Sequence, residues 1–305
     1  MPDPTTASTL SRIVDSIVPH FVSVFTFDLG RYLIAAGLIS LGLWAAKQWA
    51  DNRRIQKRRA VKGDYIREFS SSLRTVFVFG VTTMSTVAMM EFGLVRFTES
   101  FSWGIFALQV VAMIIAHDAY FYWMHRGLHH KRLFRATHLH HHKSRTPTPW
   151  AAYSFSSWEA VAEAAFVPLF LLAATTLGVE YMGFAVFIFL WHMIFRNVIG
   201  HAGVELYPAG WVDNKFVSWW NTTTHHDLHH SAGTHNFGLY FTWWDRMMGT
   251  EHPQYKERFR AVAKPFRIGS GRKNPRPAEI ASIAAMGLFA SWAALGDLAA
   301  GLPLG

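Results

Sequence analysis

Long apolar stretches separated by short polar segments dominate this chain. A helix that crosses a bilayer needs roughly 20 predominantly apolar residues. Several stretches reach that length only when flanking Trp, Tyr, Arg and Lys residues are counted as interfacial anchors. We therefore predict an all-α integral membrane protein rather than a soluble protein with a large helical core. The six stretches comprise residues 32–46, 75–95, 101–116, 164–179, 181–195 and 280–296.

Basic residues concentrate in three segments, 51–68, 125–145 and 256–276, whereas the other connections are short and nearly uncharged. Because cytoplasmic loops of membrane proteins carry the excess of Lys and Arg, we place all three segments in the cytoplasm. Two transmembrane hairpins follow, at residues 74–124 and 158–197. Each hairpin would begin and end on the cytoplasmic side.

The two ends of the chain give weaker patterns. Residues 10–27 predict an interfacial amphipathic helix interrupted at Pro19, and residues 267–277 predict a linker to the last transmembrane helix. The first ten residues, MPDPTTASTL, lack a basic region, so we expect no cleaved signal peptide. We expect a multi-pass protein with a cytoplasmic functional face, in a bacterial inner membrane rather than the endoplasmic reticulum.

Composition narrows the chemistry that the chain can support. Its 305 residues carry a formal net charge of +9, and the basic residues lie beside apolar spans, which favours an anionic membrane surface over nucleic acid. There is no cysteine. Disulfides, zinc–thiolate sites and iron–sulfur ligation are therefore excluded, and any metal must be held by nitrogen and oxygen.

Histidine supplies the nitrogen, with 17 residues in the chain. One H-x-x-x-H motif and two H-x-x-H-H motifs lie at the ends of apolar helices. In a helix, positions i, i+3 and i+4 share a face, so each motif is predicted to present its nitrogens in one direction. Neutral imidazoles suit a first-row metal, and nine ligands are too many for one ion. Two metal ions are the economical interpretation, with candidate ligands His125, His129, His138, His141, His142, His201, His226, His229 and His230.

The other histidines are weighed differently. We expect His20, His130, His140 and His252 to be surface or packing residues, and the pattern leaves His117, His192, His225 and His235 undecided. A loose histidine-rich tract would be irregular, whereas here one spacing occurs twice. No H-E-x-x-H motif is present, so a zinc-protease arrangement has no support.

The motifs HRGLH, HLHHH and HHDLHH, in this order, resemble the fatty acid hydroxylase/sterol desaturase superfamily of integral-membrane di-iron enzymes. Their flanks DAYFYWMHR, NVIGHAGVE and NFGLYFTWWDRMMGTEH are similar to it too, and the resemblance covers about Ala112 to His252. It implies that the nine histidines are the catalytic metal ligands. It also divides the chain into N-terminal interfacial and transmembrane helices (1–100), a catalytic domain (101–255), and a cytoplasmic linker with a C-terminal transmembrane helix (256–305).

Three polar residues are candidates for supporting these ligands. Some members of the superfamily have a further histidine where this chain has Asn197, which would ligate through oxygen, hold a water or leave the position open. The alternative is that Asn197 only caps a broken helix end. Asp118 lies on the same helix face as His125 and would accept a ring N–H from a ligand histidine. Asp227 is either a similar support or a plain helix-face carboxylate.

The resemblance implies two iron ions, with zinc as a substitute after purification, and O2 as co-substrate. The implied reaction is C–H hydroxylation of a lipid or sterol-like substrate from the bilayer; lipid or sterol desaturation and ether-lipid monooxygenation are the alternatives within the superfamily. Electrons would come from an acidic donor such as a ferredoxin or a b-type cytochrome with its reductase. A membrane metal transporter and a non-catalytic metal-stabilised scaffold remain as alternatives, although a transporter would carry ligands near the midplane.

Overall fold

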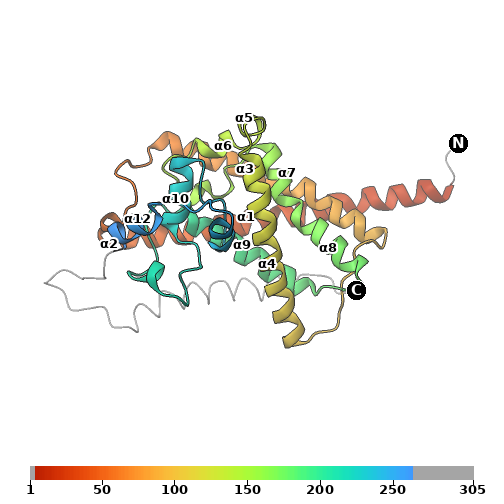
Figure 1. Cartoon of the computed structure of the whole chain (residues 1–305). Helices are drawn as coiled ribbons and strands as arrows, with labels where there is room; N and C mark the ends of the chain where they lie inside the picture. Colours follow the sequence, from red (N-terminus) through yellow and green to blue (C-terminus); the bar gives the residue numbers. More distant parts are fainter. Residues whose placement is uncertain (1–3, 264–305) are drawn as a thin grey trace. The chain divides into compact units, whose positions relative to one another are not determined.

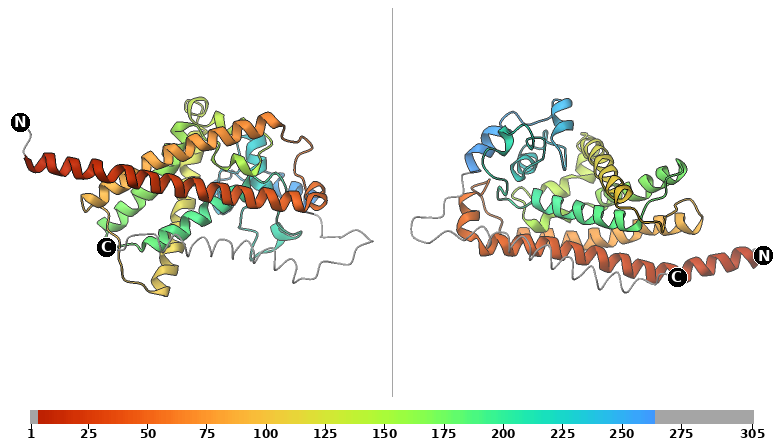
Figure 2. Two further views of the ribbon diagram at one scale, coloured as in Figure 1. Left: turned by 180° about the vertical axis from the view of Figure 1, so that it is seen from behind. Right: turned by 90° about the horizontal axis from the view of Figure 1, so that it is seen from below.

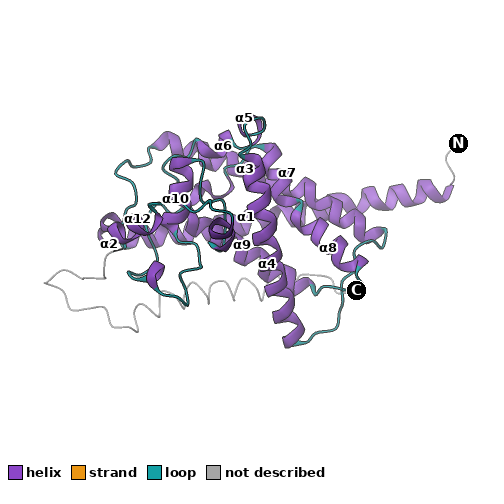
Figure 3. Ribbon diagram, in the orientation of Figure 1, coloured by secondary structure: helices purple, strands orange, loops and turns teal. Residues whose placement is uncertain are grey.

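The computed structural model describes residues 4–263, with side chains from residue 17 onward. Within these residues the regular elements are helices, and no β-strand occurs beyond isolated bridges such as Trp220–Phe241 (Figure 3). The predicted all-α class is confirmed. The elements in chain order (Figure 1) are α1 Pro4–Ala45, α2 Lys47–Asn52, α3 Lys62–Glu91, α4 Trp103–Leu128, α5 Phe134–Thr137, α6 Leu139–His142, η1 Pro149–Tyr153, α7 Ser157–Ala164, α8 Phe166–Thr176, α9 Gly183–Gly200, η2 Trp211–Asp213, α10 Thr223–Ala232, α11 Trp243–Met247 and α12 Tyr255–Val262.

Five segments among the described residues are long and apolar enough to cross a membrane: residues 17–45, 62–91, 103–128, 157–176 and 183–200. Only 28–39% of the residues in their most apolar windows are buried. The outward side chains include Trp44 and Trp103, at 74% and 73% exposure, which suits contact with lipid. The sixth predicted span, residues 280–296, and the predicted linker before it lie outside the described residues.

The N-terminal prediction was wrong at Pro19. The helix α1 continues through this proline instead of breaking there. A proline inside a helix removes one backbone hydrogen bond and crowds the carbonyl four residues earlier. Membrane helices tolerate this, because neighbouring groups and small local adjustments satisfy the freed carbonyl. Residues 17–45 thus form one membrane-length segment rather than a short interfacial helix.

Four of the membrane-length segments follow one another along the chain in two pairs, α3 then α4 and α7–α8 then α9, and they pack across these pairs: α3 contacts α7 and α8, and α4 contacts α9. The helix α1 packs along α3 and α9 (Figure 2). A buried cluster that includes Tyr32, Val76, Tyr153 and Ile194 joins these elements. The shorter elements α5, α6, η1 and α10–α12 come from the connections between the long helices and the segment after them. They carry most of the histidine motifs.

Candidate dimetal site

The helix α10 brings three of the nine predicted ligands to the centre of the site. Its N-terminus is capped by Thr222, whose hydroxyl accepts a hydrogen bond from the backbone N–H of His225 at 3.3 Å. Its C-terminus is Gly233 at φ +71°, a left-handed conformation that glycine adopts without steric cost. Every residue from 223 to 230 is buried, although the sequence TTHHDLHH is mostly polar. Such a helix needs partners for its imidazoles.

Those partners are the other predicted histidines, and all nine gather into two groups. In each group, one ligand atom from every member lies within 4.8 Å of the others. We call the first the five-histidine group: His125, His129, His138, His142 and His229. We call the second the four-histidine group: His141, His201, His226 and His230.

Nε2 atoms converge within both groups. In the five-histidine group, His142 Nε2 lies 3.1 Å from His129 Nε2 and 3.0 Å from His229 Nε2. His125 and His138 approach at 2.9 Å through the same atoms. A metal held by imidazole at about 2.1 Å separates neighbouring ligand nitrogens by roughly 3.0 Å in octahedral and 3.4 Å in tetrahedral geometry. The observed separations therefore fit ligands of a common ion.

In the four-histidine group, His201 contacts all three other histidines. Its Nε2 lies 3.0 Å from that of His226, 3.1 Å from that of His230 and 3.3 Å from that of His141. The helix α9 ends at Gly200, so His201 follows as its C-cap. A side chain at Gly200 would come within 3.4 Å of the His226 ring. Glycine therefore lets the end of α9 approach α10.

The prediction that each H-x-x-H-H motif points its three nitrogens in one direction was wrong. His138 and His142 join the five-histidine group while His141 joins the other; His226 and His230 join the four-histidine group while His229 joins the other. Residues four apart lie about 40° apart around a helix, whereas the residue between them in each pair is offset by about 60–100°. Each motif therefore serves both groups.

Ring nitrogens that face away from the five-histidine group have specific partners. His125 Nδ1 lies 2.9 Å from the Phe237 carbonyl oxygen, and His229 Nδ1 lies 2.7 Å from that of His235. His138 Nδ1 lies 2.7 Å from Glu159 Oε1, a close contact between buried side chains that are 2% and 1% exposed, although its angle is not that of a hydrogen bond. Such partners fix the tautomer and the orientation of a ligating ring.

Glu159 was missed by the sequence analysis. The available signal was an ionisable residue inside the apolar segment 157–176, which in membrane helices faces the protein interior and has a function. The carbonyl partners could not be found in this way, because every residue has a carbonyl group. Which carbonyls contact the histidines depends on the path of the backbone after α10, which the sequence pattern does not reveal.

In the four-histidine group, only two of the four outward-facing Nδ1 atoms have a partner in the described part of the chain. His201 Nδ1 donates to the Asn197 carbonyl oxygen at 2.8 Å, and His141 Nδ1 lies 3.4 Å from the Ser154 carbonyl oxygen. The Nδ1 atoms of His226 and His230 are buried and have no hydrogen-bond partner among the described residues. Two of these four rings are thus oriented by packing and by their own helix.

Burial favours neutral imidazoles at both groups. It lowers the pKa of His142 and His201 to about 4, and that of His129 to about 2, where the neighbouring histidines add to the effect. The pKa of His226 and His230 is likewise held well below the ordinary range, by burial and then by adjacent histidines. Neutral imidazole is the form that ligates metal. Converging Nε2 lone pairs without protons between them would repel one another unless a cation lies between them.

Asp118 has a different role from the one predicted. Its Oδ1 accepts hydrogen bonds from the backbone N–H groups of Tyr240 and Phe241, at 2.9 and 3.2 Å, and its Oδ2 accepts from the Trp243 indole at 2.6 Å. A buried carboxylate is drawn to such a set of donors. Asp118 therefore holds the loop that follows Phe237 and supports His125 only through that loop.

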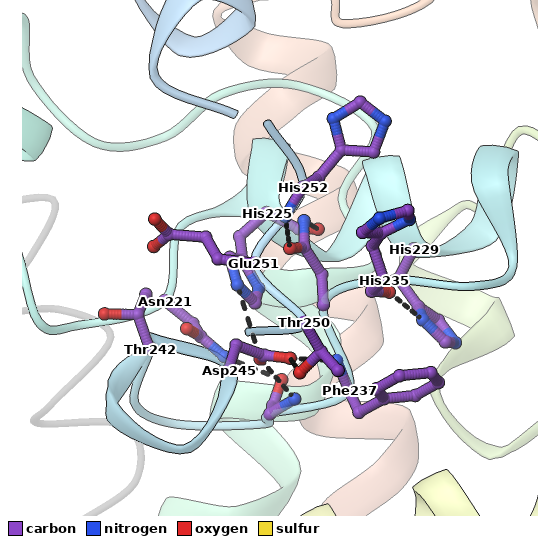
Figure 4. Close-up of polar contacts among 12 residues, drawn as sticks. Asn221, His225, His229, His235, Phe237, Thr242, Asp245, Thr250, Glu251 and His252 are labelled. Carbon is purple, nitrogen blue, oxygen red and sulfur yellow. Dashed lines mark hydrogen bonds and ion pairs between the residues drawn. The ribbon is translucent and has the colours of Figure 1, made fainter. Parts of the chain in front are cut away.

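Asp245 holds the same loop from its other side (Figure 4). Its Oδ1 accepts from the Phe237 N–H at 2.9 Å and from the Thr250 hydroxyl at 2.7 Å, and its Oδ2 accepts from the Gly238 N–H at 2.8 Å. His225 Nε2 lies 3.6 Å from Oδ2. The conformation requires glycine at position 238, because an added Cβ would lie 2.6 Å from the Phe241 carbonyl oxygen.

The remaining predicted supports do not contact a ligand ring through their side chains. The Asn197 amide donates to the Ala152 carbonyl oxygen at 2.8 Å, so it links α9 to η1 instead of capping the helix end. Asp227 Oδ1 accepts from Gln56 at 2.9 Å, and burial raises the pKa of Asp227 to about 7.

Histidines outside the two groups are packing residues or lie near the site. His140 contacts the Ser71 hydroxyl at 2.7 Å, and His252 stacks edge-on against His235, whose carbonyl supports His229. His117 is buried and His192 is half-buried, and both rings lie beside Tyr240. His117 also lines the cavity described next.

A cavity of about 240 Å³ lies among α1, α3, α4, α8 and α9 and is mostly apolar. None of the nine histidines of the two groups lines it, but two of its lining residues contact the four-histidine group. Phe155 lines the cavity and its ring centre lies 5.2 Å from that of His141; Asn197 also lines it and holds the His201 ring. A ligand in this cavity would meet the four-histidine group first.

Residues 110–250 match the family model described as fatty acid hydroxylase. A Delta(7)-sterol 5(6)-desaturase of Gibberella zeae is 28% identical over 159 residues, which are 52% of this chain and 46% of that protein. A lathosterol oxidase of Rattus norvegicus is 24% identical over 246 residues, 78% of each chain. A C-4 methylsterol oxidase of Schizosaccharomyces pombe is 29% identical over 165 residues, 53% of each chain. No solved structure matches the chain.

Proposed function

We propose that this chain is a membrane-bound, O2-dependent di-iron oxidoreductase of the fatty acid hydroxylase/sterol desaturase superfamily, because residues 110–250 match the fatty acid hydroxylase model and its relatives include sterol desaturases and oxidases. It hydroxylates a C–H bond of a lipid or sterol-like substrate. The observation that carries this proposal is the separation of nine buried histidines into two groups, each with the spacing of ligands around one ion.

The donor set fits iron. All nine ligands are neutral nitrogen donors, and a pair of ferrous ions held by them would supply the electrons and open positions that activate O2 for attack on an unactivated C–H bond. His125, His129, His138, His142 and His229 would hold one ion, and the four-histidine group would hold the other. The Phe237 and His235 carbonyls and Glu159 lie on the Nδ1 atoms of His125, His229 and His138, and would leave the Nε2 atoms of these three rings deprotonated and directed inward.

The rest of the chain binds the substrate and excludes water. The cavity at the four-histidine group is bounded by apolar side chains from membrane-length helices, so a substrate can enter it from the bilayer. Phe155 and Asn197 lie between the cavity and the ligand rings. They determine which carbon of the substrate approaches the site.

Desaturation is the second candidate reaction. One of the three relatives above is named a sterol desaturase, and the other two are named a lathosterol oxidase and a methylsterol oxidase. Hydroxylation adds one oxygen to the substrate, whereas desaturation removes two hydrogens. Incubating the reconstituted, iron-loaded protein with an electron donor, O2 and host lipid extract, followed by lipid mass spectrometry, separates these outcomes from ether-lipid monooxygenation.

The same experiment tests the wider proposal. Anaerobic and chelator-treated samples should give no product. A protein that binds two metal ions yet consumes no O2 with any lipid fraction would instead be the metal-stabilised scaffold. A transporter would move metal across a vesicle membrane, which is measured on the same reconstituted sample.

We further propose that the site faces the cytoplasm and receives electrons from an acidic carrier, a ferredoxin or a b-type cytochrome with its reductase. Exposed basic residues lie in the segment before α3 and in those around α5 and α6: Lys57, Arg58, Arg59, Lys131, Arg132, Arg135, Lys143 and Arg145. Positive surfaces accelerate association with acidic partners. Turnover limited by the donor should slow as salt rises, and reporter fusions at Arg58 and Lys143 should lie on the same side; opposite sides would contradict the topology.

A further inference from the structure

The apolar cavity contains a charged pair that a hydrocarbon ligand would not need. Asp28 and Arg31 lie on α1, line the cavity and are 4% and 2% exposed. Arg31 Nε donates to Asp28 Oδ1 at 2.6 Å, and Arg31 Nη1 donates to the Leu190 carbonyl oxygen at 2.9 Å. Both residues lie outside the segment 110–250 that matches the family model. Nothing in that match assigns them a role.

Their depth makes the pair unusual. Arg31 lies 14 residues from either end of the membrane-length segment Ile17–Ala45, at its middle. Ionisable residues at this depth are costly to insert, and where they occur they face the interior and mark substrate pathways. A pair retained here solely for stability could be replaced by apolar residues at little cost.

Two further polar side chains in the cavity lack partners. The hydroxyl of Tyr153 and both ring nitrogens of His117 are buried and have no hydrogen-bond partner among the described residues. Both residues line the cavity and are 1% exposed. The Arg31 guanidinium carbon lies 5.7 Å from the centre of the Tyr153 ring. Buried polar atoms without partners are uncommon in folded proteins and point to a ligand or water that satisfies them.

We propose that Asp28, Arg31 and Tyr153 bind a hydroxyl group of the substrate, and that the substrate is a lipid alcohol of the sterol type. This inference rests on the proposed function for its assumption that the cavity holds the substrate. A hydroxyl donates one hydrogen bond and accepts others, so it pairs with the Asp28 carboxylate and with the Arg31 or Tyr153 donors together. A plain hydrocarbon satisfies neither side, and a carboxylate is repelled by Asp28.

Equilibrium binding to the metal-loaded protein in lipid nanodiscs tests the proposal. Radiolabelled cholestanol is competed with unlabelled cholestanol, with its deoxy hydrocarbon cholestane, and with cholestanol hemisuccinate. The wild type should bind cholestanol at least about tenfold more tightly than it binds cholestane or the hemisuccinate, since a site built for a hydroxyl leaves polar groups unpaired without one. Wild-type protein that binds cholestane as tightly as cholestanol overturns the proposal.

Variants of the cavity residues show which side chains cause the preference for cholestanol over cholestane. Asp28→Leu with Arg31→Met removes the pair without leaving one buried charge, and it should bind cholestanol and cholestane equally. Tyr153→Phe removes a single hydroxyl, is the variant least prone to misfold, and should reduce the preference by about threefold. The control, Arg96→Met with Glu180→Gln, removes an exposed pair joined at 3.3 Å and should keep the full preference. A double variant of Asp28 and Arg31 that retains the preference also overturns the proposal.

The same samples separate this inference from the proposed function. Metal content and O2 consumption are measured beside binding. Protein that prefers cholestanol but never consumes O2 rejects the oxidase while keeping the alcohol site. Protein that consumes O2 with lipid but shows no preference for the alcohol keeps the oxidase and rejects the site.

Discussion

The two histidine groups lie side by side in sequence and in space, yet they are supported differently. The five-histidine group has a carboxylate, Glu159, and the carbonyls of Phe237 and His235 on its outward nitrogens. The four-histidine group has carbonyl partners for His201 and His141, whereas the Nδ1 atoms of His226 and His230 have none among the described residues. Two residues that line the cavity, Phe155 and Asn197, contact rings of the second group.

The difference suggests that the two groups bind their metal ions with different affinity. Outer partners of a ligating histidine hold its ring and raise metal affinity, and losing one typically costs 10–100-fold. We infer that the five-histidine group retains its ion firmly. The four-histidine group has one ligand fewer and looser rings, so its ion would keep a position open beside the substrate.

The largest effect is expected at His201. Its Nε2 is within 3.3 Å of the other three ring nitrogens in its group. His201→Ala should leave one metal per chain and lower turnover by more than about 100-fold, because a ligand matters more than its outer partners. Metal analysis and O2 consumption on one sample check this. An active variant with two metals would refute the assignment of His201.

Glu159→Gln tests the other side of the comparison. Glutamine keeps the shape but replaces the carboxyl oxygen that can accept from His138 Nδ1, so the ion of the five-histidine group should bind about 10–100-fold more weakly. Competition with a metal-buffering dye gives the affinity. The matched control is Glu251→Gln, at a carboxylate that pairs with Arg246 on the surface. Equal losses in both variants would mean that the contact with His138 carries no metal affinity.

Chelation should distinguish the groups without any mutation. Exposure of the wild type to excess chelator should release the two ions in two phases, the faster from the four-histidine group, with rates that differ by about tenfold. His201→Ala should lack the fast phase, and Glu159→Gln should accelerate the slow one. A single phase in the wild type would show that the two groups hold metal equally well and that the contrast in anchoring has no consequence.

These contrasts were only partly predictable. The apolar spans and the recurrence of one histidine spacing sufficed for the helical class and for the nine residues that gather. The allocation of ligands was not predictable, because residues such as His141 and His229 point toward the neighbouring group only once α6 and α10 are fixed in space. Asp118 shows the same limit. The sequence placed it on the helix face of His125, but its carboxylate accepts three N–H hydrogen bonds from the loop after Phe237 and none from a ligand histidine.

The smallest effect is expected at Asn197, the position at which the resemblance implies a further histidine in some members of the superfamily. Its amide now bonds Ala152 and its own carbonyl holds His201, so Asn197→Ala should keep both metals and lose about 1 kcal/mol of stability, the value of one buried hydrogen bond. Asn197→His places an imidazole one turn before His201 on the same face. If that ring reaches the four-histidine group, it adds a fifth ligand and makes the two groups alike.

The chelation rates decide between the two roles of this position. With a fifth ligand the fast phase should slow by about threefold to tenfold, and turnover should fall because the open position and the cavity end are both filled. If the ring stays in the cavity, the fast phase should be unchanged and only turnover and stability should fall. In that case Asn197 is a tether between α9 and η1, and the looseness of the four-histidine group comes from the unsupported rings of His226 and His230 rather than from a missing ligand.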